Sequence, residues 1–337
     1  MVQASGIRVP RGQAEATRRR LLELDVLRID LAVAKDGDDI VFPVLETCGP
    51  QLPLVQHDFE ARAVRPAGYQ DLLPWPAEKR ALAPRAFDQV GDILIVKVPK
   101  DFDNPADTKD LGRSLLDFHP AARAAFHDKG VKDEFRVRDL VRIAGAGESL
   151  TMVNENKARL WVDPAQAYFS PRLASERARV AALVRAGEHI LDLFGGVAPF
   201  GIQAALAGAS VDSIDLNPAA CDLARRNVTL NGVEGRVRVH LGDARKVAAT
   251  LGPADRIVMN LPHGAKAFLD VAAKAAKPGA TVHYHEIMPP ERADDRTREV
   301  VAELARHGWR CKPKGHRVVR NYSPQEAHVV FDLEGAP

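Results

Sequence analysis

Cysteine is scarce in this sequence, and the three residues present do not form a framework. Cys48, Cys221 and Cys311 are odd in number, far apart and without the paired spacing of a zinc site. Long apolar runs are also missing: neither the segment MVQASGIRVPRG nor any later stretch resembles a signal peptide or reaches the length of a membrane span. We therefore expect a soluble, cytoplasmic, monomeric protein with no metal and no membrane partner.

A strong excess of charge is lacking as well. The net charge is +2, so the overall balance indicates no particular partner. Basic residues are clustered at 18–20, at 136–142 and at 310–320, where five Lys or Arg residues and His316 occur with no acid. Such clusters could neutralise the phosphates of a nucleic acid. For any single cluster, a solvated surface is the simpler interpretation.

The length of 337 residues and the 46% hydrophobic content predict two or three domains. Residues 1–62 are expected to form a small α/β domain, with a helix over 13–24 and strands over 25–35 and 38–46. A proline-rich linker over 63–84 follows. Residues 85–164 predict a middle β-rich domain. It should contain a strand over 91–99, a helix over 108–129, and a hairpin formed by 135–145 and 149–163.

In residues 165–337, apolar strands alternate with helices, which is typical of a parallel, doubly wound α/β sheet. Two further β-rich segments, HRVVRN and AHVVFDLE, end the sequence. The expected strands are 188–194, 210–216, 236–243, 255–260 and 280–287, and the expected helices are 199–208, 217–229, 264–276 and 291–307.

Polar residues follow four successive strands of this predicted sheet. Asp192 precedes a glycine-rich loop, at the position where doubly wound folds bind ligands. The loop is not GxGxxG, and a carboxylate there suits the cationic methionine part of S-adenosylmethionine. Asp215 could accept hydrogen bonds from the ribose hydroxyls, and Asp243 could accept a hydrogen bond from the adenine amino group. Asn260 is the polar residue that ends the fourth strand. Each acid could be only a helix cap, but four in register favour a nucleoside-type cofactor.

Several motifs recur in one recognisable combination: YFSPRLASER, DLFGGVAPF, DLNP, GDAR and MNLP, with PRAFDQVGDILIVKVP and RVVRNYSP beside them. Together these motifs resemble the archaeal and eukaryotic tRNA (guanine, position 37)-N1-methyltransferases. The resemblance implies a class I, Rossmann-like methyltransferase fold, S-adenosylmethionine as the donor, tRNA as the partner, and N1 of the guanine 3′ to the anticodon as the acceptor. The segment GIRVPRG looks like the family's extra tRNA-binding domain.

The resemblance also implies roles for individual residues. Glu176 would accept the N1 proton, and Arg136 would stabilise charge on the base. The guanine pocket would be lined by Tyr168, Arg172, Asn260 and Pro262. The expected cofactor contacts are Arg177, Asp192, Phe194, Gly195, Gly196, Val197, Asp215, Leu216, Asn217, Asp243, Ala244 and Asn260. The sequence departs from the family at His263, where an aromatic residue or Lys is common, and at Ala198, where Gly is usual.

The chemistry of guanine explains why such groups are needed. N1 becomes nucleophilic only as its proton leaves, and a positioned carboxylate can take that proton. Negative charge then builds on O6, where a guanidinium supplies fixed donors. An asparagine offers both an acceptor and a donor to the guanine edge. On the residues alone, Glu176 could instead only favour its helix N-terminus, and Arg136 could be a surface residue.

Three other functions use similar sequence features. A transferase of wyosine biosynthesis would move the aminocarboxypropyl group of the same cofactor. If the chain were a non-catalytic RNA-binding protein, we would expect some of the polar residues at the strand ends to be replaced, yet all four are present. A nicotinamide oxidoreductase is disfavoured by the glycine loop.

Overall fold

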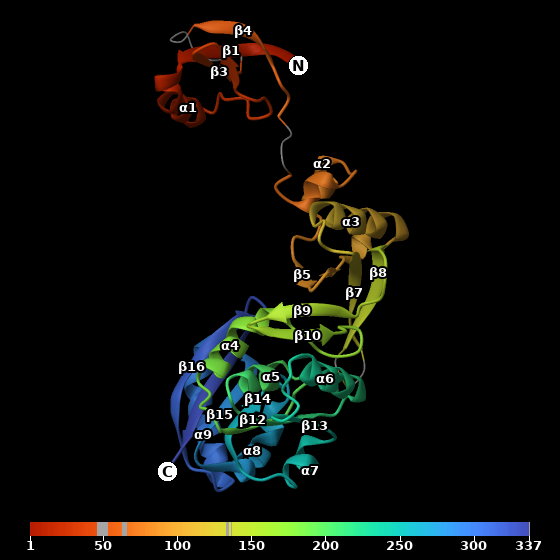
Figure 1. Ribbon diagram of the computed structural model, residues 1–337, viewed down its shortest axis with the longest axis vertical. Coiled ribbons are helices and arrows are strands. Elements are labelled where there is room, and N and C mark those ends of the chain that lie inside the picture. Colours follow the sequence, from red (N-terminus) through yellow and green to blue (C-terminus); the bar gives the residue numbers. More distant parts are fainter. Residues whose placement is uncertain (46–52, 63–65, 133–134, 136, 337) are drawn as a thin grey trace. The chain divides into compact units, whose positions relative to one another are not determined.

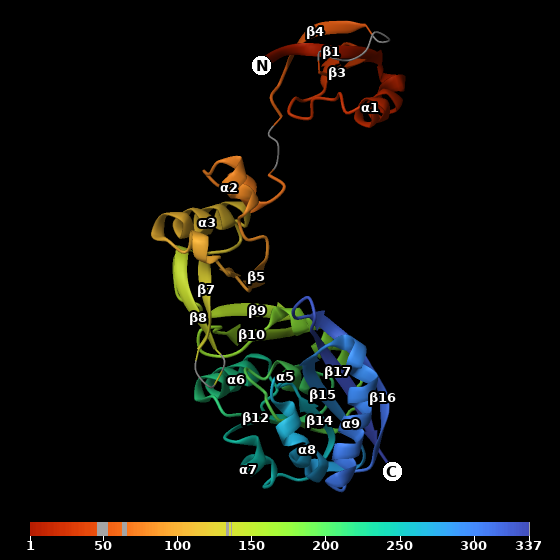
Figure 2. The same cartoon turned by 180° about the vertical axis from the view of Figure 1, so that it is seen from behind.

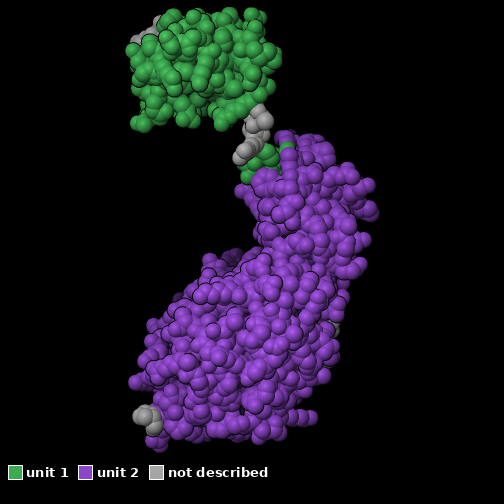
Figure 3. Space-filling model, in the orientation of Figure 1, with its two compact units in different colours: residues 1–71 green, residues 72–337 purple. Residues whose placement is uncertain are grey.

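The computed structural model describes residues 1–45, 53–62, 66–132, 135 and 137–336. It divides into two compact units, Met1–Asp71 and Leu72–Pro337, which are described separately (Figure 3). Cys48 and Arg136, both named above, lie outside the described residues.

The first unit is a four-stranded antiparallel sheet, in the order β2-β3-β1-β4, packed against helix α1. The strand expected over 25–35 is wrong, because only Ala34 and Lys35 of that range lie in a strand. Strand β1 was not expected, since Gly6 interrupts its pattern. A β-carbon there would lie 2.7 Å from Val41 Cγ1, so close packing explains the glycine. The elements are β1 (Val2–Pro10), η1 (Arg11–Gln13), α1 (Ala14–Glu23), β2 (Ala34–Asp36), β3 (Asp39–Pro43), β4 (Leu54–Phe59) and η2 (Tyr69–Leu72).

The second unit begins with a sheet in the order β5-β6-β7-β8 and helix α3. The helix expected over 108–129 is too long: α3 ends at Phe118, because the helical conformation is disfavoured before Pro120. Part of the expected linker 63–84 is packed, since Trp75 stacks on Phe102 at 5.3 Å and donates to Asp110. The elements are α2 (Ala77–Ala81), β5 (Phe87–Val90), β6 (Ile93–Val96), η3 (Lys100–Phe102), α3 (Pro105–Phe118), β7 (Ala124–Lys132) and β8 (Val137–Gly145).

A separate hairpin, β9 (Thr151–Glu155) and β10 (Ala158–Val162), follows this sheet. The hairpin expected between 135–145 and 149–163 is therefore wrong: β8 pairs with β7, and the second segment folds on itself. The turn residues Asn156 and Lys157 have φ values of +48° and +72°. Without a glycine, the sequence Asn-Lys did not indicate this turn.

The C-terminal part is a seven-stranded sheet in the order β13-β12-β11-β14-β15-β17-β16. Strands β11 to β15 pair in parallel, whereas β17 is antiparallel to both of its neighbours, so the expected doubly wound sheet is confirmed. Figures 1 and 2 show its two sides. The strands are β11 (His189–Asp192), β12 (Ser210–Asp215), β13 (Val237–Leu241), β14 (Ala254–Met259), β15 (Ala276–Met288), β16 (Cys311–Asn321) and β17 (Ala327–Gly335). The helices are η4 (Pro171–Leu173), α4 (Ala174–Ala182), α5 (Pro199–Leu206), α6 (Pro218–Leu230), α7 (Ala244–Ala248), η5 (Ala265–Phe268), α8 (Leu269–Ala275), η6 (Pro290–Arg292) and α9 (Ala293–Arg306).

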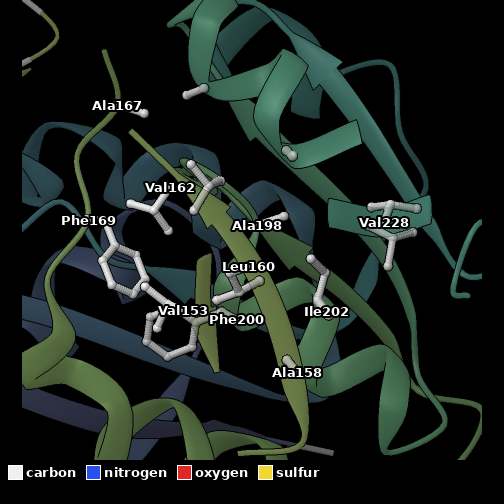
Figure 4. Close-up of a cluster of buried hydrophobic side chains, with 14 of the residues drawn as sticks. Val153, Ala158, Leu160, Val162, Ala167, Phe169, Ala198, Phe200, Ile202 and Val228 are labelled. Carbon is white, nitrogen blue, oxygen red and sulfur yellow. The ribbon is translucent and has the colours of Figure 1, made fainter. Parts of the chain in front are cut away.

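Alternating strand residues face two separate cores. Ile190 and Val258 pack with α4, α5, α6 and the β9–β10 hairpin, and Figure 4 shows Phe169, Leu160 and Phe200 within this cluster. Leu191 and its neighbours pack with α7, α8 and α9. Because both faces are covered, the ligand-accessible part of the sheet is the edge where the parallel strands end.

Candidate active site

The loop after β11 is pressed against β12. The Gly195 N–H donates to the Ile214 carbonyl at 2.7 Å, and a β-carbon on Gly195 would lie 2.0 Å from Ser213 Oγ. Gly196 adopts a φ of +55°, which favours glycine. Ala198 adopts +62° without being glycine and caps α5. Although Ala198 stands where the family usually has glycine, the backbone there keeps the left-handed conformation, and the alanine methyl group is fully buried.

Asp192 ends β11 as a buried acid. Its side chain is 1% exposed, and neither carboxylate oxygen has a hydrogen-bond partner among the described residues. Burial raises the pKa of Asp192 to about 7; the Phe194 backbone N–H, which does not reach hydrogen-bond geometry, opposes this shift, and the nearby charge of Asp215 adds to it. An unpaired buried carboxylate is costly, so this group is suited to a ligand that brings donors.

Asp215 at the end of β12 holds the glycine loop. Its Oδ2 accepts from the Gly196 N–H at 2.7 Å, and its Oδ1 accepts from the Asn217 N–H at 2.9 Å. Burial nevertheless raises the pKa of Asp215. Each carboxylate oxygen has a second lone pair, so these bonds leave room for a ligand hydroxyl. Leu216 beside it is exposed.

Two of the expected cofactor residues act as helix caps. The Asn217 side chain accepts from the Ala219 N–H and donates to the Gln166 carbonyl. Asp243 caps α7 by accepting from the Arg245 N–H at 2.8 Å, while Ala244 is buried behind it. Asp243 remains partly exposed, so capping and ligand contact are compatible there.

Aromatic contacts line the same edge. Phe194 meets Phe268 edge to face at 4.9 Å, and the Arg245 guanidinium lies 3.8 Å from the Phe268 ring centre. These contacts connect the end of β11 with the start of α7. Val197 is fully buried in the core beneath the loop, so it supports the loop from below.

Asn260 follows β14 and has a buried Oδ1 without a hydrogen-bond partner among the described residues. The next residues are held against β15, because the Ile287 N–H donates to the Pro262 carbonyl at 3.0 Å. His263 contacts Tyr322 edge to face at 5.4 Å. His263, which stands where the family commonly has an aromatic residue or Lys, thus still contacts an aromatic ring, that of Tyr322 in the RVVRNYSP segment.

Glu176 and Arg177 are both buried at the start of α4. Arg177 donates twice to Glu155, at 2.5 Å each, and to the Ser170 carbonyl. Gln203 also donates to Glu155. The charge of Arg177 is thus neutralised inside the protein, and its expected cofactor contact stays a prediction.

The Glu176 carboxylate is bound by Arg179, from one turn further along α4. Arg179 Nε donates to Oε2 at 2.9 Å and Nη2 donates to Oε1 at 2.6 Å, while Arg317 Nη1 lies 3.5 Å from Oε2. Sequence reasoning missed Arg179, as well as Glu155. The spacing of three residues between Glu176 and Arg179 was the available signal for that pair.

The remaining substrate candidates are partly exposed. Tyr168 is 41% exposed, and Arg172 donates to Asp88 at 2.9 Å. Burial disfavours the charge of Asp88, but Arg138 and Arg172 together lower its pKa. Arg136 lies outside the described residues, so its expected role stays a prediction.

The basic clusters differ in how far they are neutralised. Arg18 and Arg20 are exposed on α1. Lys312 and Lys314 both pair with Glu334, and Arg138 pairs with Asp88 and Asp128. Within the described ranges, no group of three or more His, Cys, Asp or Glu side chains is arranged to hold a metal ion. Among the same residues, no helix has the length and apolarity needed to span a bilayer.

Three parts of the chain match known families. Residues 151–312 match the TRM5/TYW2 methyltransferase domain, residues 69–148 the TYW2 N-terminal domain, and residues 6–50 the tRNA methyltransferase 5 N-terminal domain. These matches follow the chain from the first unit to the seven-stranded sheet.

Two individual relatives extend over nearly the whole chain, and a third covers a smaller part of it. The tRNA (guanine(37)-N(1))-methyltransferase Trm5b of Pyrococcus abyssi is 35% identical over 97% of this chain and 98% of its own. Its crystal structure superimposes with a TM-score of 0.83 over 99% of this chain and 100% of that one, at 33% identity. The complex of aTrm5 and tRNALeu gives a TM-score of 0.76 at 28% identity, over 98% and 99% of the two chains. A tRNA(Phe) (4-demethylwyosine(37)-C(7)) aminocarboxypropyltransferase of Pyrococcus horikoshii is 26% identical over 77% of this chain and 92% of its own.

Proposed function

This chain belongs to the tRNA (guanine(37)-N(1))-methyltransferase family, and on that premise we propose that it transfers a methyl group from S-adenosylmethionine to N1 of guanine 37 in tRNA. The observation that carries the proposal is the near-complete coverage by Trm5b of Pyrococcus abyssi. We also propose the cytoplasm as its compartment, where its tRNA substrate would be modified, and a monomer as its form.

The residues at the strand ends fit S-adenosylmethionine. Among the described residues, no donor forms a hydrogen bond with the buried Asp192 carboxylate or with the buried Asn260 Oδ1, so both can accept hydrogen bonds from a ligand. The amine-bearing end of the cofactor would suit Asp192, and the ribose would suit Asp215. The glycine loop lets a ligand approach the backbone, and Asp243 would suit the adenine amino group. When bound, the cofactor supplies a methyl group already activated on a sulfonium, so no metal is required.

The proposed work of the protein is to hold the guanine and to remove its N1 proton. Glu176 would accept that proton, and Asn260 would present its amide to the guanine edge. Arg136 would stabilise the charge that develops on O6. Tyr168, Arg172 and Pro262 would line the base pocket. By holding N1 in line with the methyl group, the pocket would lower the barrier to methyl transfer.

The first unit would dock the tRNA. Residues 6–50 match the tRNA methyltransferase 5 N-terminal domain. The exposed basic side chains of α1 suit phosphates, which attract cations irrespective of sequence. The domain limits expected above, with a docking domain over 1–62 and a methyltransferase domain over 165–337, stay part of this proposal.

Aminocarboxypropyl transfer is the second candidate, because one such transferase is 26% identical to this chain. That relative covers 77% of the chain against 97% for Trm5b, which favours methylation.

Mass spectrometry of tRNA fragments after incubation with enzyme and S-adenosylmethionine tests the proposal. A single methyl group on the fragment containing guanine 37, absent when that guanine is replaced, is the expected product. The larger mass of an aminocarboxypropyl group, or a methyl group elsewhere, would overturn it.

A further inference from the structure

A buried network of charged side chains leads away from Glu176. Arg179, which binds both Glu176 oxygens, also donates to Asp332 on β17, with Nη1 2.7 Å from Oδ2 and Nη2 3.0 Å from Oδ1. Arg179 therefore binds two carboxylates at once and is only 15% exposed. Because the guanidinium forms two hydrogen bonds with each of the two carboxylates, its plane and its position are both fixed.

The network continues across the sheet. Asp332 Oδ1 lies 2.5 Å from His283 Nδ1 on β15, and His283 Nε2 lies 2.8 Å from Arg256 Nη1 on β14. Arg256 in turn donates to both oxygens of Glu188, which precedes β11. The connected side chains thus come from α4, β17, β15, β14 and the segment before β11. Strands β14, β15 and β17 are neighbours in the seven-stranded sheet, and Figure 2 labels all three.

Chemistry decides the proton positions at the centre of this network. A guanidinium only donates, so His283 Nε2 must accept from Arg256. His283 Nδ1 therefore carries the hydrogen and donates to Asp332. Burial lowers the pKa of His283, in agreement with a neutral ring. Burial disfavours the charge of Asp332, but its bonds to His283 and Arg179 lower its pKa well below the usual range. Asp332 thus keeps its negative charge and holds Arg179.

The hydrogen bonds from Arg179 occupy only part of the Glu176 carboxylate. A carboxylate has about two lone-pair sites on each oxygen. Arg179 occupies one site on each oxygen, and the Arg317 guanidinium lies 3.5 Å from Oε2 as an ion pair from β16. Each oxygen keeps a second site, and Oε2 carries the additional ion pair, so we place the transferred proton on Oε1.

We propose that Arg179 is a positioning residue, which holds the Glu176 carboxylate in the orientation needed for proton removal, and that Asp332, His283 and Arg256 fix Arg179 in that place. The inference rests on the proposed function, because Glu176 acts as a base only if guanine N1 is the acceptor. In the step concerned, the N1–H bond breaks, the proton moves to Glu176 Oε1, and the electron pair stays on N1. Arg179 then faces a neutral acid and retains its bond to Asp332, so the network holds its geometry through the step.

The test uses the full chain, unmodified tRNA and S-adenosylmethionine under single-turnover conditions across a range of pH. Four proteins form a double-mutant cycle: the natural sequence, Arg179→Lys, Glu176→Gln and the double variant. Arg179→Lys keeps the charge but loses the fork. We expect it to lower the rate constant at saturating tRNA about 10- to 100-fold, as misplacement of a reacting group does. The acid limb of its pH–rate profile should change as well, because the hydrogen bonds to the group that takes the proton are altered.

The decisive comparison is made in the Glu176→Gln background. There the same lysine substitution should change the rate constant less than about 3-fold, since the group it positions is gone. Asp332→Asn is the second variant: it leaves both Arg179 and Glu176 in the chain and should shift the same acid limb. Arg225→Lys is the matched control, because Arg225 pairs with Asp222 at the same spacing on an exposed helix face. Its rate and pH profile should not change.

Binding of S-adenosylhomocysteine and of tRNA is measured in parallel and should stay within about 3-fold of the natural protein. Equal losses of rate in both backgrounds, or an unmoved acid limb, would show that Arg179 only stabilises the fold. A Glu176→Gln protein of normal rate would also overturn the inference, because no base would remain for Arg179 to position. A natural protein that does not methylate guanine N1 would overturn the proposed function itself, and the product mass identifies that case separately.

Discussion

Gly195 and Ser213 are packed so closely that a β-carbon on Gly195 would lie 2.0 Å from the Ser213 hydroxyl oxygen. We expect Gly195→Ala to lower the free energy of unfolding by about 1–3 kcal/mol, because overpacking forces the loop away from β12. Because the displaced loop would also lose its fit to the cofactor, binding of S-adenosylhomocysteine should weaken at least about 10-fold, which corresponds to about 1.4 kcal/mol. Chemical denaturation and calorimetry measure the two effects.

Two further variants identify the cause. Gly235→Ala is the control, since a β-carbon there would meet nothing within 4 Å. Adding Ser213→Ala to Gly195→Ala removes the atom at 2.0 Å and leaves the Ser213 β-carbon at 3.3 Å. The double variant should regain most of the lost stability. A double variant as weak as Gly195→Ala alone would show that the clash is not the reason for glycine at this position.

The buried Asp192 predicts a dependence of stability on pH. Its pKa is raised to about 7 in the folded protein, above the unfolded value near 4, so the folded state binds more protons between these limits. The contribution of Asp192 to the free energy of unfolding of the ligand-free protein should therefore fall as pH rises from about 4 to 7. Asp192→Asn should remove this loss and be more stable than the natural protein at pH 8, by about 1–3 kcal/mol.

The same substitution should weaken binding of S-adenosylhomocysteine, whose amine end loses a charged acceptor. Asp222→Asn, on an exposed residue, serves as the control for both measurements. Parallel stability curves for Asp192→Asn and the natural protein between pH 5 and 8 would contradict the assignment of the buried charge.

The C-terminal sheet could be predicted because its strands are short apolar runs that alternate with helices. Both faces of such strands are buried, so periodicity and burial agree. The middle region was harder. The expected hairpin between 135–145 and 149–163 is wrong because Asn156 and Lys157 form a left-handed turn without glycine, so that 149–163 folds on itself. The helix expected from Thr108 ran past Pro120, whereas α3 ends at Phe118.

The candidate site could be predicted as far as its strand ends. Asp192, Asp215, Asp243 and Asn260 follow successive strands, and parallel strands bring their ends to one edge. The second carboxylate that binds Arg179 could not be found in the same way. Asp332 lies 156 positions after Glu176, and only strand pairing between β15 and β17 brings it to His283 and Arg179.

The basic side chains of the first unit predict a salt-dependent affinity for tRNA. Each phosphate contact adds about 0.7–0.9 to the slope of log affinity against log salt. Deleting residues 1–62 should therefore flatten the slope, and Arg18→Ala with Arg20→Ala should flatten it by up to about 2. Filter binding at several salt concentrations measures this. An unchanged slope in both proteins would show that these side chains are only solvated surface.

Glu176→Gln tests the proposed base. The substitution keeps the shape of the side chain and one acceptor for Arg179, so cofactor binding should be preserved. We expect the single-turnover rate of methyl transfer to fall roughly 10²- to 10⁴-fold, because no group remains to take the N1 proton. The acid limb of the pH–rate profile should change as well. Single-turnover conditions are needed, because slow product release could hide a chemical defect.

The competing explanation is that Glu176 serves only the fold. It lies in the first turn of α4, where an acid stabilises the helix by about 0.3–1 kcal/mol. It also neutralises Arg179, so its loss would leave a partly uncompensated buried charge. Under that explanation, Glu176→Gln would lower the melting temperature and leave the chemical step nearly intact. A stable variant that binds S-adenosylhomocysteine normally but transfers methyl slowly separates the two, since a helix terminus does not affect proton transfer. A normal rate with unchanged pH dependence would end the general-base assignment.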